Sequence, residues 1–69
     1  MQPTFKRGEK VKMEYNNTYC IILCSGEKHE DRDMFYGTVI ESNNNEDFVG
    51  DFTDWYKPLF SLYTDPVTI

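Results

Sequence analysis

The sequence predicts an all-β domain, a small barrel of about five antiparallel strands. Short runs of alternating or continuous apolar residues are separated by turns rich in Asn and Gly, which is the pattern of strands joined by tight connections. Aromatic residues make up 16% of the chain, and such residues favour strands and fill small cores efficiently. The 69 residues leave no room for the crossover helices that parallel strands require. We treat 1–69 as one domain, with a lead-in (1–7) and a tail (64–69) outside the barrel.

The N-terminal third predicts two strands joined by a tight turn. In the first strand, over 10–15, apolar and polar residues alternate strictly. Asn16 and Asn17 predict the turn, because Asn tolerates left-handed backbone geometry. The second strand, over 18–24, is apolar on both faces.

A charged loop over 25–33 leads into the third strand, over 34–42, which is again apolar on both faces. Gly37 lies inside this strand and predicts a bend or a close approach of another backbone. An Asn-rich turn over 43–47 ends this part of the chain.

The C-terminal part predicts two short strands and at most one helical turn. A short strand begins at Phe48, and the residues Thr-Asp-Trp-Tyr predict one short helical turn near 53–57. Pro58 limits that turn, because proline cannot continue a helix interior. A last strand over 59–63 completes the barrel.

The predicted core combines the inward-facing residues of these strands. Its members are Val11, Met13, Tyr15, Phe35, Val39 and Phe60, with either Ile21 or Ile22. The strands over 18–24 and 34–42 have a second apolar face, which a lone barrel of this length would expose to water. We therefore expect a homodimer or higher oligomer in which a second copy covers these outer faces.

Cys20 and Cys24 are the only cysteines, and the strand prediction keeps them apart. Four residues of extended chain separate their α-carbons by ~13 Å, whereas a disulfide requires less than about 7 Å. Two unbridged thiols favour a reducing cytoplasm. The sequence shows no signal peptide and no membrane-spanning apolar run, so we discount the glycosylation sequon that begins at Asn16.

The net charge of −5 is divided unevenly along the chain. Residues 1–12 hold four basic residues and one acidic residue, a net of +3, whereas 13–69 hold three basic and eleven acidic residues, a net of −8. Phosphate repulsion makes such an acidic chain a poor partner for duplex nucleic acid.

No catalytic or metal-binding pattern is visible in the sequence. His29 is the only histidine and lies in the charged loop, where a solvated side chain is the simplest interpretation. Two cysteines on one strand and one distant histidine lack the short-spaced ligand pairs of zinc sites, and the acidic loop does not match an EF-hand. We therefore expect neither enzymatic activity nor a metal or cofactor.

Two sets of residues are candidates for binding. The acidic set consists of Glu27, Glu30, Asp31, Asp33, Asp51 and Asp54. Its negative charge fits a basic protein partner. Together with Glu46 and Asp47, the same carboxylates would resemble the phosphates of DNA. The alternative set offers aromatic rings for stacking on a nucleobase and cations for its phosphate. It consists of Arg7, Lys10, Lys12, Arg32, Trp55 and Tyr56.

Three short motifs carry a family resemblance. The first is Gly-x-x-Val from Gly8, the second is Phe-x-Gly-x-Val-Ile from Phe35, and the third runs from Val49-Gly50 through Trp55 to Phe60. In this order they are similar to short phage and prophage proteins that resemble SH3-like barrels. The resemblance covers roughly 5–62 and implies an accessory protein of the host cytosol that binds rather than catalyses.

We carry three functional hypotheses from the sequence. The first is a phage-type protein that binds and inhibits a host protein of defence or nucleic-acid handling through the acidic set. The second is an anti-defence sponge that holds a small nucleotide signal in an intersubunit pocket lined by the alternative set. The third is a structural or regulatory component of a larger assembly.

Overall fold

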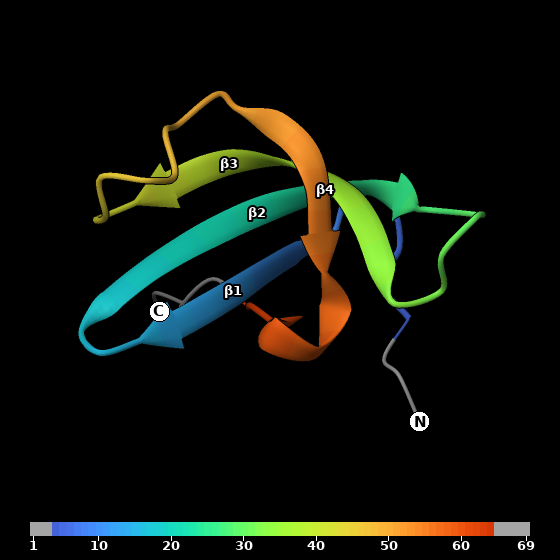
Figure 1. Cartoon of the computed structure of the whole chain (residues 1–69), viewed down its shortest axis with the longest axis horizontal. Helices are drawn as coiled ribbons and strands as arrows, with labels where there is room; N and C mark the ends of the chain where they lie inside the picture. Colours follow the sequence, from blue (N-terminus) through green and yellow to red (C-terminus); the bar gives the residue numbers. More distant parts are fainter. Residues whose placement is uncertain (1–3, 65–69) are drawn as a thin grey trace, which may run out of the picture.

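The computed structural model describes residues 4–64 and is all-β, as predicted. Five antiparallel strands form one sheet in the order β4-β3-β2-β1-β5, with one 3₁₀ turn, η1, before the last strand (Figure 1). This strand order is that of an SH3-like barrel. The elements are β1 (Lys10–Tyr15), β2 (Thr18–Glu27), β3 (Met34–Ser42), β4 (Phe52–Tyr56), η1 (Lys57–Leu59) and β5 (Ser61–Leu62). The tail predicted over 64–69 lies outside the described residues except for Thr64.

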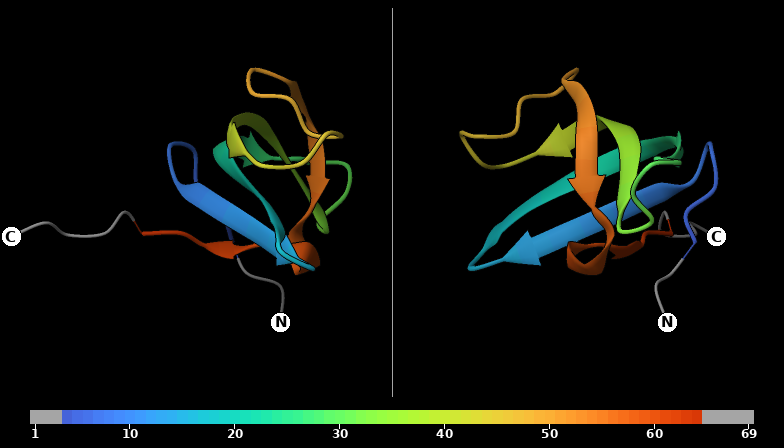
Figure 2. Two further views of the ribbon diagram at one scale, coloured as in Figure 1. Left: turned by 90° about the vertical axis from the view of Figure 1, so that its left-hand side faces the viewer. Right: turned by 45° about the vertical axis from the view of Figure 1, so that its right-hand side comes forward.

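The long strands β2 and β3 lie side by side and curve together, and β4 crosses beside them before η1 returns the chain toward β1 (Figures 1 and 2). Both views of Figure 2 show a strongly curved sheet. Cross-strand partners point to the same side of an antiparallel sheet. The aligned residues Val11, Ile22 and Val39 therefore mark the inner face, and all three are buried.

The core is organised around Phe35, whose ring meets two other aromatic rings edge to face. The ring centroids of Phe35 and Phe5 lie 5.3 Å apart, and those of Phe35 and Phe60 lie 5.2 Å apart. Phe5 belongs to the lead-in that we placed outside the barrel, yet only 1% of its surface is exposed. The backbone N–H of Gly8 donates to the carbonyl of Cys24 at 2.8 Å, and this bond holds the lead-in against β2.

Further sequence-based expectations differ from the structure, and one of them is the strand predicted to begin at Phe48, because β4 begins at Phe52. Tyr15 was expected in the core but is 72% exposed, because it is the last residue of β1, at the tip of the hairpin. The helical turn expected near 53–57 occurs at Lys57–Leu59, because Trp55 pairs with Phe35 and extends β4 as far as Tyr56. The last strand is correspondingly shorter than predicted.

Gly37 permits the close backbone approach that its position predicted. A Cβ added there would lie 2.3 Å from Cγ2 of Ile22 and 3.0 Å from the carbonyl oxygen of Leu23. The indole Nε1 of Trp55 donates to the carbonyl of Gly37 at 3.0 Å. These contacts bring β2, β3 and β4 close together over the core.

Both cysteines are free and buried, which confirms that they do not bridge each other. Burial raises the pKa of the Cys20 thiol to about 11, with a further contribution from the carboxylate of Asp47. Burial also raises the pKa of Cys24. Both thiols therefore stay protonated near neutral pH.

Lys57 is a buried charge that the sequence did not reveal, since only 3% of its surface is exposed. Its ammonium group donates to Oε1 of Glu27 at 2.9 Å, and its backbone N–H donates to the carbonyl of Asp33 at 2.7 Å. η1 is thereby tied to the connection between β2 and β3. Over residues 4–64, no helix has the length and apolar character needed to cross a lipid bilayer.

Candidate binding cleft

A cleft of about 630 Å³ lies between the β1–β2 hairpin, the turn that follows β3, and η1. We call it the hairpin cleft. Its lining residues are Met13, Glu14, Tyr15, Thr18, Asn44, Asn45, Glu46, Asp47 and Leu59. The volume is within the range of small-ligand sites and is ample for one long side chain of a partner.

The lining of the hairpin cleft combines apolar surface with negative charge. Met13 and Leu59 supply aliphatic surface, whereas Glu14, Glu46 and Asp47 supply carboxylates. No lysine, arginine or histidine is among its lining residues. Such a surface favours an aliphatic group that ends in a positive charge.

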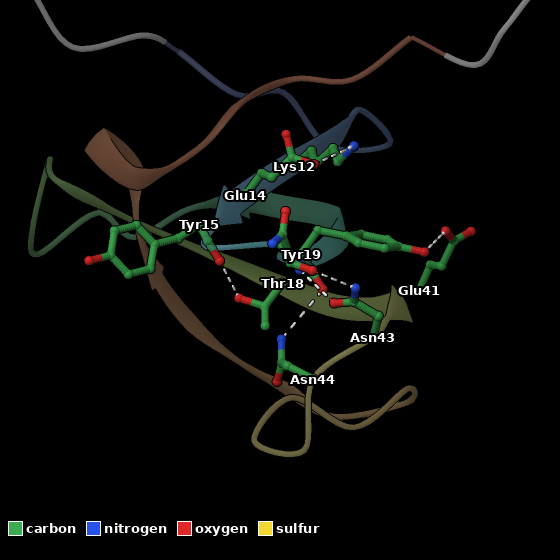
Figure 3. Close-up of polar contacts among 9 residues, drawn as sticks. Lys12, Glu14, Tyr15, Thr18, Tyr19, Glu41, Asn43 and Asn44 are labelled. Carbon is green, nitrogen blue, oxygen red and sulfur yellow. Dashed lines mark hydrogen bonds and ion pairs between the residues drawn. The ribbon is translucent and has the colours of Figure 1, made fainter.

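Asn43 fastens the turn after β3 to the β1–β2 hairpin. Its Oδ1 accepts the backbone N–H of Tyr19 at 2.7 Å, and its Nδ2 donates to the carbonyl of Asn17 at 2.9 Å. Its own backbone N–H donates to the carbonyl of Tyr19 at 3.2 Å. Figure 3 shows Asn43 and Asn44 reaching from the turn toward Tyr19. The two walls of the cleft are therefore joined by specific hydrogen bonds.

Asn44 fixes the turn internally. Its Oδ1 accepts the backbone N–H groups of Glu46 at 2.9 Å and Asp47 at 2.7 Å, and its Nδ2 donates to Oδ2 of Asp47 at 3.1 Å. Asn side chains commonly mimic a backbone turn in this way. The backbone that carries both acidic residues of the turn is thus set before any ligand arrives.

The hairpin itself is a tight turn built from two left-handed residues. Asn16 has φ of 49° and Asn17 has φ of 65°, as expected for the asparagines of a two-residue hairpin. Thr18 Oγ1 donates to the carbonyl of Tyr15 at 2.5 Å, closing the turn (Figure 3). This geometry confirms the tight turn predicted at these positions.

The three carboxylates of the cleft have different surroundings. Glu14 lies 3.7 Å from Nζ of Lys12 on the same strand, in a solvent-exposed pair. Asp47 is half-buried and lies close enough to Cys20 to help raise the pKa of that thiol. Glu46 is exposed at the rim. The cleft therefore presents negative charge both at its rim and on its wall.

The predicted acidic set does not form one surface. Glu27 accepts from the buried Lys57, and Oδ2 of Asp54 accepts from Nζ of Lys28 at 2.8 Å. The hydrogen bond between Lys28 and Asp54 raises the pKa of the lysine and lowers that of the aspartate. Glu27 and Asp54 are thus neutralised by partners from distant parts of the sequence.

The other four acidic residues lie in two separate places. Glu30, Asp31 and Asp33 belong to the loop between β2 and β3, where Oδ1 of Asp31 accepts the backbone N–H of Asp33 at 3.0 Å. Asp51 precedes β4, and its carbonyl accepts the backbone N–H of Val39 at 2.9 Å. The strand register places the other end of β4, at Tyr56, beside the start of β3. The length of β4 therefore separates Asp51 from the acidic loop.

The alternative basic and aromatic set is also dispersed, and none of its members lines the hairpin cleft. Lys12 lies over the rings of Tyr19 and Tyr63, with Nζ 5.1 and 5.8 Å from their centroids. Trp55 packs against the core, edge to face with Phe60. The remaining members lie elsewhere: Arg7 in the lead-in, Lys10 on β1, Arg32 in the β2–β3 loop and the exposed Tyr56 at the end of β4.

Sequence reasoning did not assemble the residues of the hairpin cleft. The usable signal was the run Asn-Asn-Asn-Glu-Asp directly after β3, because consecutive Asn and Asp side chains favour turns that fix nearby carboxylates. No protein-family model, curated protein or solved structure matches the chain.

Proposed function

We propose that this protein is a non-catalytic binding module whose hairpin cleft accepts a lysine or arginine side chain of a partner protein. The observation that carries the proposal is the combination of three carboxylates with aliphatic surface, and the absence of any basic lining residue, in a cleft of about 630 Å³. An aliphatic stem that ends in a cation matches both parts of that surface.

In the cell, we propose, the protein acts as an accessory protein that binds a basic segment of a host protein and thereby inhibits it. The phage resemblance implies such a role, and the net charge of −5 supports it. Long-range attraction speeds the encounter with a basic partner. Added salt would weaken it, because charges are screened within ~8 Å at physiological ionic strength. The proposed location remains the host cytoplasm.

The nucleotide-sponge hypothesis receives less support from the geometry. A nucleotide phosphate would meet only carboxylates among the charged residues of the hairpin cleft. The indole N–H of Trp55 is already bonded to the carbonyl of Gly37, and the ring packs against the core. We keep nucleotide binding as an outcome of the test rather than as a second proposal.

The test is a titration of the ¹⁵N-labelled protein with two short peptides of equal length, one rich in arginine and one rich in glutamate. We expect the arginine peptide to shift the amide resonances of residues 13–18 and 44–47 at lower peptide concentrations than those of 28–33. The glutamate peptide should produce no such shifts. Binding of adenosine monophosphate that depends on Lys12 or Arg32 would instead support the sponge and contradict the proposal.

A matched pair of variants localises the binding. The double substitution Glu14→Gln with Glu46→Gln removes two charges from the cleft and leaves the Asn44–Asp47 contacts in place. The control, Glu30→Gln with Asp31→Asn, removes the same charge from the β2–β3 loop. We expect the first pair to weaken binding of the arginine peptide at least tenfold and the control to weaken it less than threefold. Equal losses would mean that net charge, rather than the cleft, attracts the peptide.

A further inference from the structure

The outer face of the sheet, opposite the core, carries apolar residues that the rest of the described chain, 4–64, leaves partly exposed. One row of cross-strand partners consists of Lys10, Leu23, Thr38 and Phe52. This row is next to the buried inner row of Val11, Ile22 and Val39, so its side chains point to the opposite side of the sheet.

Four residues on β2, β3 and β4 form what we call the outer patch: Leu23, Tyr36, Ile40 and Phe52. Leu23, Tyr36 and Ile40 are each 37% exposed and Phe52 is 59% exposed. The rings of Tyr36 and Phe52 stack with centroids 6.0 Å apart and planes within 9° of parallel. Two ordered rings beside aliphatic groups make an apolar surface suited to a protein partner rather than to water.

Opposite charges flank the outer patch on its two lateral sides. On the β1 side, Lys10 and Lys12 flank the buried Val11 and therefore lie on the outer side of the sheet, where Oε2 of Glu14 is 3.7 Å from Nζ of Lys12. On the β4 side, the exposed Asp51 directly precedes β4, whereas Asp54, which pairs with Tyr36 across the strands, is held in its ion pair with Lys28. The charge asymmetry between the N-terminal segment and the rest of the sequence thus becomes an asymmetry across one face of the sheet.

We propose that a second copy of this chain covers the outer patch, related to the first by a two-fold axis parallel to the strands. Such an axis places β1 of one copy opposite β4 of the other, and β2 opposite β3. The basic side of each copy then faces the acidic side of its partner, and the two outer patches meet in the centre. The face is complementary to itself, so no other partner is required.

The size of the face limits the area that two copies could bury against each other. Strands of nine and ten residues are ~30 Å long, and the spacing of four strands makes the face ~15 Å wide. The resulting ~450 Å² in projection is below the ~800 Å² per partner of a standard stable interface. We therefore expect a weak, reversible dimer rather than a permanent one.

Sedimentation equilibrium of the full chain from ~10 to ~500 µM tests the proposal. We expect the mean mass to rise from monomer toward dimer. The substitution Ile40→Glu should keep the chain monomeric across that range, whereas Tyr15→Glu, an exposed position on the hairpin tip, should leave self-association unchanged. A parent chain that remains monomeric at ~500 µM, or a Tyr15→Glu variant that loses the dimer, would overturn the proposal.

Charge reversal tests the orientation of the axis and does not rely on Ile40→Glu folding. Lys12→Glu places two acidic groups opposite each other in its own dimer, and Asp51→Lys places two basic groups opposite each other. Each variant should dimerise at least tenfold more weakly than the parent chain. An equimolar mixture should recover heterodimers, detectable by native mass spectrometry, because both contacts are then attractive. If the mixture formed no more dimer than either variant alone, that result would contradict the proposed axis.

Discussion

Two internal connections of the molecule, at its two ends in space (Figure 1), both carry acidic residues in the sequence but differ in the contacts that those residues make. The loop between β2 and β3 has the sequence KHEDRD over residues 28–33, and the turn after β3 has NNNED over 43–47. Beside the first end, Lys57 pairs with Glu27, which directly precedes the loop, and Lys28 of the loop pairs with Asp54 of β4. At the second, asparagines fix the backbone around Glu46 and Asp47, and these carboxylates line a cleft without basic residues. The number of carboxylates is therefore a poorer guide to a site than the partners that they find.

The largest effect that we predict tests the core on which both ends depend. Phe35→Ala removes a ring that contacts Phe5 and Phe60, and such a cavity costs about 3–5 kcal/mol of unfolding free energy. Urea unfolding followed by circular dichroism measures the loss. The control is Phe48→Ala, because that ring is 63% exposed and its removal should change stability little. If the parent and Phe35→Ala chains unfolded at similar urea concentrations, Phe35 would not be central to the core.

Much of the fold follows from local sequence, as the strands that frame both ends show. The alternation around Val11 predicted β1, and Asn16 and Asn17 predicted the left-handed turn that follows it. Gly37 predicted a bend or a close backbone approach, and the carbonyl oxygen of Leu23 would lie 3.0 Å from a Cβ at this position. Each of these features depends on residues near one another in the chain or on the steric needs of one residue type.

The features that sequence reasoning missed all depend on contacts between distant residues. Phe5 lies in a segment without periodicity, and its burial results from packing on Phe35. Lys57 is polar by type, and its burial depends on Glu27, which is 30 positions away. The hairpin cleft requires β1, the turn after β3 and η1 to meet. Periodicity carries no information about contacts between residues far apart in the sequence. Neither the cleft nor the neutralised carboxylates could therefore be predicted.

The second largest predicted effect concerns the buried ion pair of the β2–β3 end. Glu27→Ala leaves the ammonium group of Lys57 buried without its acceptor, which we expect to cost about 1–3 kcal/mol of unfolding free energy. Adding Lys57→Met should recover most of that loss, because an apolar group of similar length needs no partner. Chemical unfolding of the three variants measures both steps. Failure of the double variant to recover stability would show that Lys57 contributes more than its pairing with Glu27.

A third, smaller effect tests the hydrogen bonds of the cleft end. Asn44→Ala removes the acceptor for the backbone N–H groups of Glu46 and Asp47, and we expect a loss of about 1 kcal/mol. Hydrogen exchange at those two amides should accelerate, while exchange in 28–33 stays unchanged. Asn45→Ala is the control, because the side chain of Asn45 forms no hydrogen bond with the other residues of 4–64. Slow exchange in the Asn44→Ala variant would mean that the backbone of the turn holds its shape without the side chain.

The smallest effect that we predict distinguishes the two ends by pH. Asp54 has a lowered pKa, chiefly because its carboxylate accepts a hydrogen bond from Lys28. A carboxyl group whose pKa is lower in the folded than in the unfolded state stabilises the fold above its ordinary pKa, which is 3.8 here. That contribution is lost as the pH falls through the lowered pKa of the folded state. Stability should therefore decrease from about pH 5 downward, partly through Asp54.

The variant Asp54→Asn isolates this contribution, because it keeps the shape of the side chain and removes its charge. Thermal melts between about pH 5 and pH 2 should show a shallower loss of stability for Asp54→Asn than for the parent chain, with the two curves approaching each other at the acidic limit. Glu46→Gln is the matched control at the cleft end, since no cation lies among the residues that line the cleft with Glu46. We expect the Glu46→Gln chain to keep the acid-dependent loss of stability, because the Asp54–Lys28 pair is unchanged in it. If Glu46→Gln flattened the profile as much as Asp54→Asn, the carboxylates of the two ends would be equally engaged in the folded state, and the contrast between a neutralised end and an available one would fail.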